Sequence, residues 1–173
     1  TGASSYEQST ITVWPGVYLE NVDLENKAIH LMSTDPASQT VKETTIIDGH
    51  ENGTVIKIGG RVSTAQRMNF IGETIVEGFT IRNGEAPLNL FITGTRNDFP
   101  AFSEIIAAGI YIEQVDAIIR NNIVTENGTI PVQRERNGND RSGMGIAVEG
   151  ASPTICNNAI TNNYNLVGGA GIG

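Results

Sequence analysis

The sequence GIYIEQVDAIIRNNIVTENG, residues 109–128, is followed by a second copy of its pattern, GIAVEGASPTICNNAITNN, residues 145–163. Each copy opens with Gly and an alternating apolar strand, turns at a polar corner, continues into a second apolar strand and reaches a pair of asparagines. Repetition of a short unit of this kind indicates a solenoid.

The spacing inside the unit favours one kind of solenoid. A unit of about twenty residues with short alternating strands and no helical period is typical of one turn of a parallel β-helix. Inward side chains then stack on their counterparts at about 4.8 Å. We expect Asn122 and Asn158, the second members of the two pairs, to form an inward amide ladder that satisfies buried polar groups. The alternative is two unrelated Asn-rich turns.

The aliphatic-x-Asn-Asn-x-aliphatic pattern, in Ile119–Val124 and Ile155–Ile160, resembles that of extracellular right-handed parallel β-helix repeat proteins, the pectate-lyase-like superfold. The segments Val13–Ser33, Thr44–Gly60 and Glu73–Gly84 look like the opening turns of such proteins. The resemblance implies an all-β, right-handed parallel β-helix located outside the cell or at its surface. It does not select an activity, because the superfold hosts lyases, hydrolases, epimerases, adhesins and inert modules.

We expect residues 1–173 to form a single β-helix domain of about five turns. Three long segments, 60–72, 85–107 and 129–142, are expected as loop insertions. The last residues, 167–173, begin another strand-like pattern, and solenoids normally need caps at their ends. The chain is therefore expected to be part of a longer solenoid or a unit that assembles head to tail, which can produce a filament.

Composition excludes several classes of partner. The net charge is −8 and the pI about 4.7, which disfavours nucleic-acid binding because phosphates require a basic surface. No apolar run approaches the length of a membrane span. The lone cysteine, Cys156, permits no internal disulfide and is expected to point outward. The remaining candidate partners are a polysaccharide or like subunits.

Aligning the strands predicts columns of side chains on the outside of the solenoid. The alignment takes four isoleucines as inward neighbours: Ile29, Ile56, Ile110 and Ile146. The outward column beside them contains His30, Lys57, Tyr111 and Ala147, and we take the first three as candidate carbohydrate-binding residues.

The next outward column contains Met32, Gly59, Glu113 and Glu149. Glu113 and Glu149 would lie one turn apart, and two carboxylates about 5 Å apart repel by roughly 3 kcal/mol at an effective dielectric near 20. Calcium, which takes six to eight oxygen ligands, is the candidate ion between them. The alternative is a hydrated pair of surface glutamates. The family resemblance implies that a calcium-dependent enzyme would also need a basic residue, here Lys57 or an Arg from an insertion.

Two Asn-x-Thr sequences, at Asn52 and Asn127, are glycosylation acceptors if the protein is secreted by a cell with that machinery. Otherwise they are turns.

The sequence contains no phosphate-binding loop, no zinc-ligand spacing and no nucleophile elbow. We therefore expect a non-catalytic, extracellular or cell-surface module with no certain cofactor, used for structural assembly or for binding glycans or surfaces. The alternative is a calcium-dependent polysaccharide lyase or epimerase that acts on acidic polysaccharides.

Overall fold

The computed structural model describes residues 8–60, 72–84, 108–128, 144–164 and 171–172. They form fourteen named strands and one short helix. In chain order the elements are β1 (Ser9–Val13), β2 (Gly16–Leu19), β3 (Val22–Asp23), β4 (Ile29–Ser33), α1 (Gln39–Thr44), β5 (Thr45–Asp48), β6 (Ile56–Gly59), β7 (Thr74–Glu77), β8 (Thr80–Arg82), β9 (Ala108–Glu113), β10 (Ala117–Arg120), β11 (Ile123–Thr125), β12 (Met144–Glu149), β13 (Thr154–Cys156) and β14 (Ala159–Thr161).

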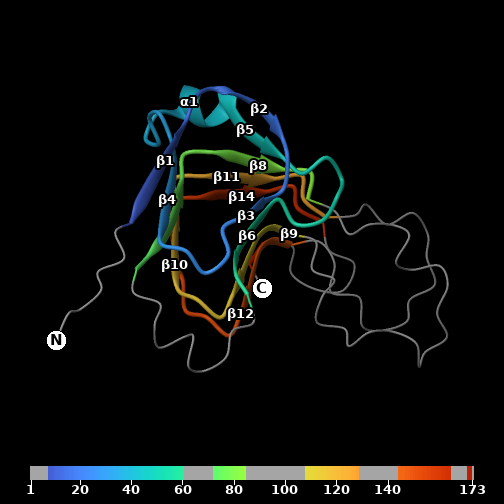
Figure 1. Ribbon diagram of the computed structural model, residues 1–173. Coiled ribbons are helices and arrows are strands. Elements are labelled where there is room, and N and C mark those ends of the chain that lie inside the picture. Colours follow the sequence, from blue (N-terminus) through green and yellow to red (C-terminus); the bar gives the residue numbers. More distant parts are fainter. Residues whose placement is uncertain (1–7, 61–71, 85–107, 129–143, 165–170, 173) are drawn as a thin grey trace, which may run out of the picture.

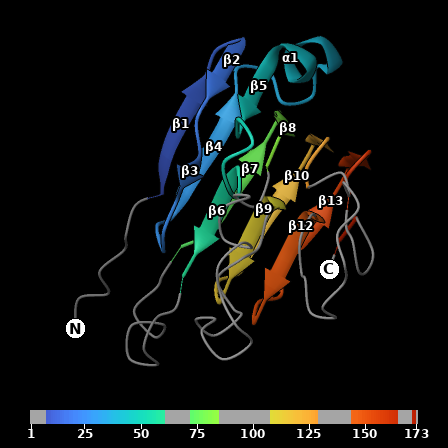
Figure 2. The same cartoon turned by 90° about the vertical axis from the view of Figure 1, so that its right-hand side faces the viewer.

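The strands build three sheets, and the chain enters them in rotation. Sheet A has the order β1-β4-β7-β10-β13, sheet B has β14-β11-β8-β5-β2, and sheet C has β12-β9-β6-β3. Figure 1 shows the three sheets as three sides around a common interior. Figure 2 shows the strands of each sheet following one another in sequence order along the solenoid. We call one passage through the sheets a rung.

All the strand pairs in these sheets are parallel. The prediction of an all-β parallel solenoid is therefore confirmed at this level. The observed register in sheet C also agrees with the predicted alignment of three of the isoleucines, because Ile56 lies beside Ile110 and Ile110 lies beside Ile146. These neighbours carry the core, because all three side chains are fully buried. Burying one such side chain contributes about 1.5–3 kcal/mol relative to leaving it exposed.

The predicted pair Asn122 and Asn158 lies at the corner between sheets A and B. The Asn158 side-chain oxygen accepts from the Asn122 backbone N–H at 2.9 Å and from its Nδ2 at 3.2 Å. Asn122 Oδ1 in turn accepts from the Phe79 N–H of the preceding rung at 3.1 Å. The residues before the ladder, Asn121 and Asn157, have positive φ values of 57° and 54°, a conformation that asparagine tolerates better than most residues. The Asn-Asn pair therefore combines a turning residue with a ladder residue.

A second amide ladder, which the sequence interpretation missed, follows sheet B. Asn163 Oδ1 accepts from the Asn127 N–H at 3.1 Å, and Asn127 Oδ1 accepts from the Gly84 N–H at 2.9 Å. Asn127 is fully buried. Its Nδ2 donates to the Ile81 carbonyl and to Asn163 Oδ1. Both ladders thus tie each corner to the next rung.

The position of His30 corrects the predicted alignment. Ile29, His30 and Met32 belong to β4 in sheet A, where His30 pairs with Thr10 and Ile75. The places beside Ile56 and Lys57 in sheet C are taken by Val22 and Asp23 of β3. The alignment was wrong at this rung because the chain turns after Asp23, where Asp23 Oδ1 accepts from the Glu25 N–H and Glu25 adopts a φ of 50°.

The helix α1 lies beside sheet B. It begins after Ser38, whose hydroxyl accepts from the Val41 N–H. The Lys42 carbonyl near its end accepts from the Thr80 hydroxyl at 2.9 Å. Among the described residues, no helix has the length and apolar character that crossing a bilayer requires.

We expect Asn122→Ala to lower the free energy of unfolding by about 2–3 kcal/mol, because it leaves the buried Phe79 N–H and Val76 carbonyl without partners. Urea unfolding followed by circular dichroism measures this loss. The control is Asn121→Gly, which keeps the positive-φ corner and should change stability by less than about 1 kcal/mol. Equal losses in the two variants would contradict the ladder's contribution.

Candidate functional site

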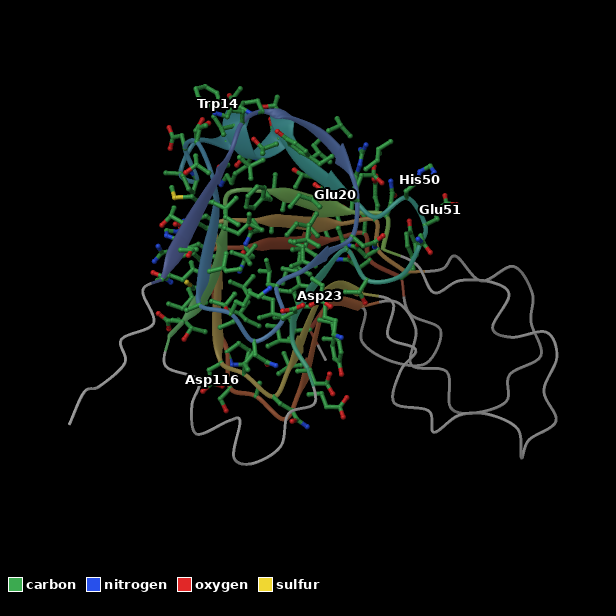
Figure 3. All side chains as sticks on the ribbon, in the orientation of Figure 1. Trp14, Glu20, Asp23, His50, Glu51 and Asp116 are labelled. Atoms are coloured by element: carbon green, nitrogen blue, oxygen red, sulfur yellow. The ribbon has the colours of Figure 1, made fainter. Side chains whose placement is uncertain are left out.

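An open polar hollow of about 420 Å³ lies beside the N-terminal part of sheet C. We call it the β3–β6 hollow. Its lining residues are Asp23, Glu25, Asn26, Lys27, Lys57, Gly59 and Gly60. Figure 3 labels Asp23 on β3 in this region. Of the predicted carbohydrate-binding residues, Lys57 is the one that lines it.

The charges that line the hollow are balanced and loosely held. Lys27 Nζ lies 2.8 Å from Glu25 Oε2, and Lys57 Nζ lies 3.8 Å from Asp23 Oδ2. The hydrogen bond and charge of Lys27 hold the pKa of Glu25 below its ordinary value of 4.5. All four side chains are more than one-third exposed, so water screens these pairs and each contributes little to stability. The four groups can therefore exchange their partners for a ligand at small cost.

Asn26 has a different role in the hollow. Its side-chain oxygen Oδ1 is buried and has no hydrogen-bond partner in the part of the chain that the structure describes. Buried polar atoms are nearly always paired, and leaving one unpaired costs about 1–3 kcal/mol. An atom in this position requires a donor, which a buried water molecule can supply.

Backbone contacts hold the hollow in shape. Leu24 N–H donates to the Lys57 carbonyl at 2.9 Å, and Gly59 N–H donates to the Glu25 carbonyl at 2.6 Å. Gly59 has a φ of 83°, and a Cβ atom at this position would run into the carbonyl oxygen of Glu113. Glycine is therefore required at position 59, which lines the β3–β6 hollow.

The predicted acidic pair lies next to the hollow. Glu113 pairs with Gly59 on one side and with Glu149 on the other, and Lys57 pairs with Tyr111. The Tyr111 hydroxyl donates to Glu149 Oε2 at 2.9 Å. Tyr111 is only 7% exposed, so its ring does not present a face on which a sugar can stack. The structure thus brings Lys57, Tyr111, Glu113 and Glu149 together and leaves His30 in another sheet.

The calcium prediction has limited support from these contacts. Two adjacent carboxylates provide fewer than the six to eight oxygens that calcium takes. Within the described ranges, no group of three or more His, Cys, Asp and Glu side chains is placed to hold a metal ion.

A second charged cluster lies on the outer face of sheet A. Glu77 accepts from Arg120 Nε at 2.6 Å and from Arg120 Nη2 at 3.2 Å, and it lies 2.6 Å from His30 Nε2. The Arg120 hydrogen bond holds the pKa of Glu77 below its ordinary value of 4.5, against the opposing effect of burial. Because all these contacts end on one buried carboxylate, the cluster joins three neighbouring strands, β4, β7 and β10.

Asp48 on sheet B is tied in a similar way. Burial raises its pKa, but hydrogen bonds from Asn83, from the His50 N–H and from Arg82 outweigh burial and leave the pKa below 3.8. The distances to these donors are 2.9–3.0 Å. Both buried carboxylates, Glu77 and Asp48, therefore connect neighbouring rungs through hydrogen bonds.

The two predicted glycosylation sites differ in access. Asn52 is exposed. Asn127, by contrast, is fully buried and uses its Nδ2 in the second ladder. A glycan on that nitrogen is incompatible with the ladder, so the structure argues against the prediction for Asn127.

Most of the hollow was not found by sequence reasoning. Asp23, Glu25, Asn26 and Lys27 come from one corner, and their side chains do not repeat in other rungs. The one available signal was the dense polar run around that corner, between Val22 and Ile29.

Comparison of the chain with protein-family models, with curated proteins and with solved structures gives no match. Membership of the β-helix family therefore remains a prediction from the sequence pattern.

We expect Glu77→Gln to lower the free energy of unfolding by about 2 kcal/mol at neutral pH, discounted for the partial exposure of Arg120. A carboxyl with a lowered pKa in the folded state stabilises the protein above its unfolded pKa and loses that contribution as pH falls through the folded pKa. The difference between wild type and variant should therefore shrink as pH falls below about 4.5. Denaturant unfolding across pH tests this, with the exposed Glu126→Gln as control. A difference that is constant down to acid pH would contradict the ion-pair explanation.

When the protein is secreted from a eukaryotic host, we expect any attached glycan at Asn52 and none at Asn127 on the folded protein. Peptide mass spectrometry measures occupancy at both sites, and Asn52→Gln should yield an unglycosylated protein. A natively folded product with a glycan on Asn127 would contradict the second ladder.

Proposed function

We propose that this chain is a non-catalytic module, folded as a right-handed parallel β-helix of about five turns, that works outside the cell or at its surface and binds uncharged polysaccharide in the β3–β6 hollow. The observation that carries the proposal is the hollow itself. Two carboxylates, two ammonium groups and the Asn26 residue line one open space.

The charge balance of the hollow favours a neutral ligand. Asp23 and Glu25 offset Lys27 and Lys57, so neither an anion nor a cation gains a net attraction from the four groups. A sugar hydroxyl both donates and accepts. It can donate to a carboxylate while it accepts from a lysine.

The hydrogen bonds that hold the buried carboxylates favour a binding function over a catalytic one. Glu77 and Asp48 are each held by several hydrogen bonds that link strands. A general base must be free to take a proton from its substrate. The alternative, a calcium-dependent lyase or epimerase, depends on the adjacent Glu113 and Glu149, and the experiment below separates the two functions.

Binding to neutral xylan and β-glucan, and to polygalacturonate with and without calcium, should be measured by affinity electrophoresis and calorimetry. We expect wild type to bind a neutral polysaccharide. Lys57→Met and Asn26→Ala should each weaken that binding about five- to tenfold, the effect of losing one hydrogen bond of about 1–1.5 kcal/mol. The control is Lys42→Met, the same substitution on α1 at a distance from the hollow.

Unchanged affinity in both hollow variants would contradict the proposed site. Binding of polygalacturonate that requires calcium, together with ultraviolet-absorbing unsaturated products, would establish the lyase alternative in its place.

A further inference from the structure

One dipeptide, Asn-Gly, recurs at the corners of the solenoid that lead from sheet B to sheet C. Three of its occurrences are described, and they are Asn52-Gly53, Asn83-Gly84 and Asn127-Gly128. A fourth, at residues 137–138, lies outside the described residues. Asparagine before glycine can deamidate spontaneously, because glycine has no Cβ to hinder its own nitrogen and readily adopts the turns that bring this nitrogen to the asparagine side chain. The three corners therefore carry the same chemistry in three different environments.

The Asn83-Gly84 corner holds both groups that would have to react. The Asn83 side-chain nitrogen donates to the two carboxylate oxygens of Asp48, each at 3.0 Å. The Gly84 N–H donates to Asn127 Oδ1 at 2.9 Å. The amide that would leave and the nitrogen that would attack are thus both engaged in hydrogen bonds to other rungs.

The Asn127-Gly128 corner is held still more firmly. Asn127 is fully buried, and its Nδ2 donates to the Ile81 carbonyl and to Asn163 Oδ1. The Gly128 N–H donates to the Gly84 carbonyl at 2.6 Å. Reaction at this corner requires the second amide ladder to open, and such local opening costs free energy.

The Asn52-Gly53 corner differs from both. Asn52 is exposed, and within the described ranges no hydrogen bond engages its side chain or the Gly53 N–H. A Cβ atom built on Gly53, which has a φ of 82°, would meet no atom within 4 Å, so there is room for a ring to form on its backbone. Figure 3 shows the preceding residues, His50 and Glu51, on the outer side of this corner.

We propose that Asn52 is a site of spontaneous deamidation in the folded protein, whereas Asn83 and Asn127 are protected by the rungs that hold them. The Gly53 nitrogen gives up its proton to hydroxide and attacks Cγ of Asn52. A bond forms between this nitrogen and Cγ, the bond from Cγ to Nδ2 breaks, and the amide nitrogen leaves as ammonia. Water then opens the resulting succinimide ring at either carbonyl and yields aspartate or isoaspartate. One water molecule is consumed for each ammonia released, and no oxidant or cofactor is needed.

Deamidation would change this corner in two ways. It adds one negative charge, next to Glu51, to a chain whose net charge is already −8. It also removes the amide nitrogen to which a glycan is attached in an Asn-x-Thr sequence, so that glycosylation and deamidation compete for the same atom of Asn52. Neither effect depends on the β3–β6 hollow.

Peptide mass spectrometry of the folded protein tests the proposal, after incubation in mildly alkaline buffer of material made in a host that does not glycosylate it. We expect Asn52 to deamidate at least tenfold faster than Asn83 and Asn127, since an opening cost of about 1.4 kcal/mol at those corners is enough for a tenfold difference. In concentrated urea the three rates should converge, because the dipeptide is the same. Equal rates in the folded protein, or a faster reaction at Asn83 or Asn127, would overturn the proposal.

Two variants separate the chemistry from its protection. Asn52→Gln should abolish the isoaspartate signal from the peptide that spans position 52, since glutamine must close a larger ring, and isoaspartyl methyltransferase labelling measures this signal. Asn163→Ala removes the side-chain oxygen that accepts from Asn127 and should raise the rate at Asn127 severalfold without changing the rate at Asn52. Circular dichroism checks that both variants are folded. An unchanged rate at Asn127 in folded Asn163→Ala would contradict protection by the ladder, and an isoaspartate signal that persists in Asn52→Gln would contradict the assigned site.

Discussion

Hydrogen bonding from one rung to the next is the constraint on which the rest of this structure depends. A parallel sheet pairs every strand with a neighbour from another rung, so each residue has a counterpart about 4.8 Å away. The two amide ladders extend this pairing through the corners, where a strand can no longer supply it. Side chains therefore occur in rows, and a residue's chemistry depends on which row it occupies.

That constraint separates the charged residues into two kinds. Carboxylates buried between rungs, such as Glu77 and Asp48, are surrounded by donors from neighbouring strands and hold the stack together. Charged residues at the corner after β3 are exposed and only loosely paired. The second kind is available to a ligand, because little stability is lost when its partners change. The β3–β6 hollow is the place where several of these residues meet.

The sequence predicts the register well where rungs have equal length and poorly where they do not. Asn122 and Asn158 are 36 residues apart, the same spacing as Ile110 and Ile146, so a single alignment recovers both pairs. The ladder of Asn127 and Asn163 has that spacing too and was recoverable from the same alignment. Earlier rungs differ in length, since Glu77 contacts His30 at 47 residues and Arg120 at 43. A periodic alignment cannot place Ile29 or His30 under those conditions, and the non-repeating corner that forms the hollow leaves no periodic signal.

The corners of the solenoid are not equally free to change in length. Two residues join β7 to β8, β10 to β11 and β13 to β14, whereas residues 83–107 join β8 to β9 and residues 126–143 join β11 to β12. In the last two rungs the short corner carries a ladder asparagine whose amide reaches the adjoining rung, so an added residue there would break bonds on both sides. The connections from sheet B to sheet C differ in length from rung to rung. Evolution can therefore lengthen and diversify the chain along one side of the solenoid while the opposite corner keeps the rungs aligned.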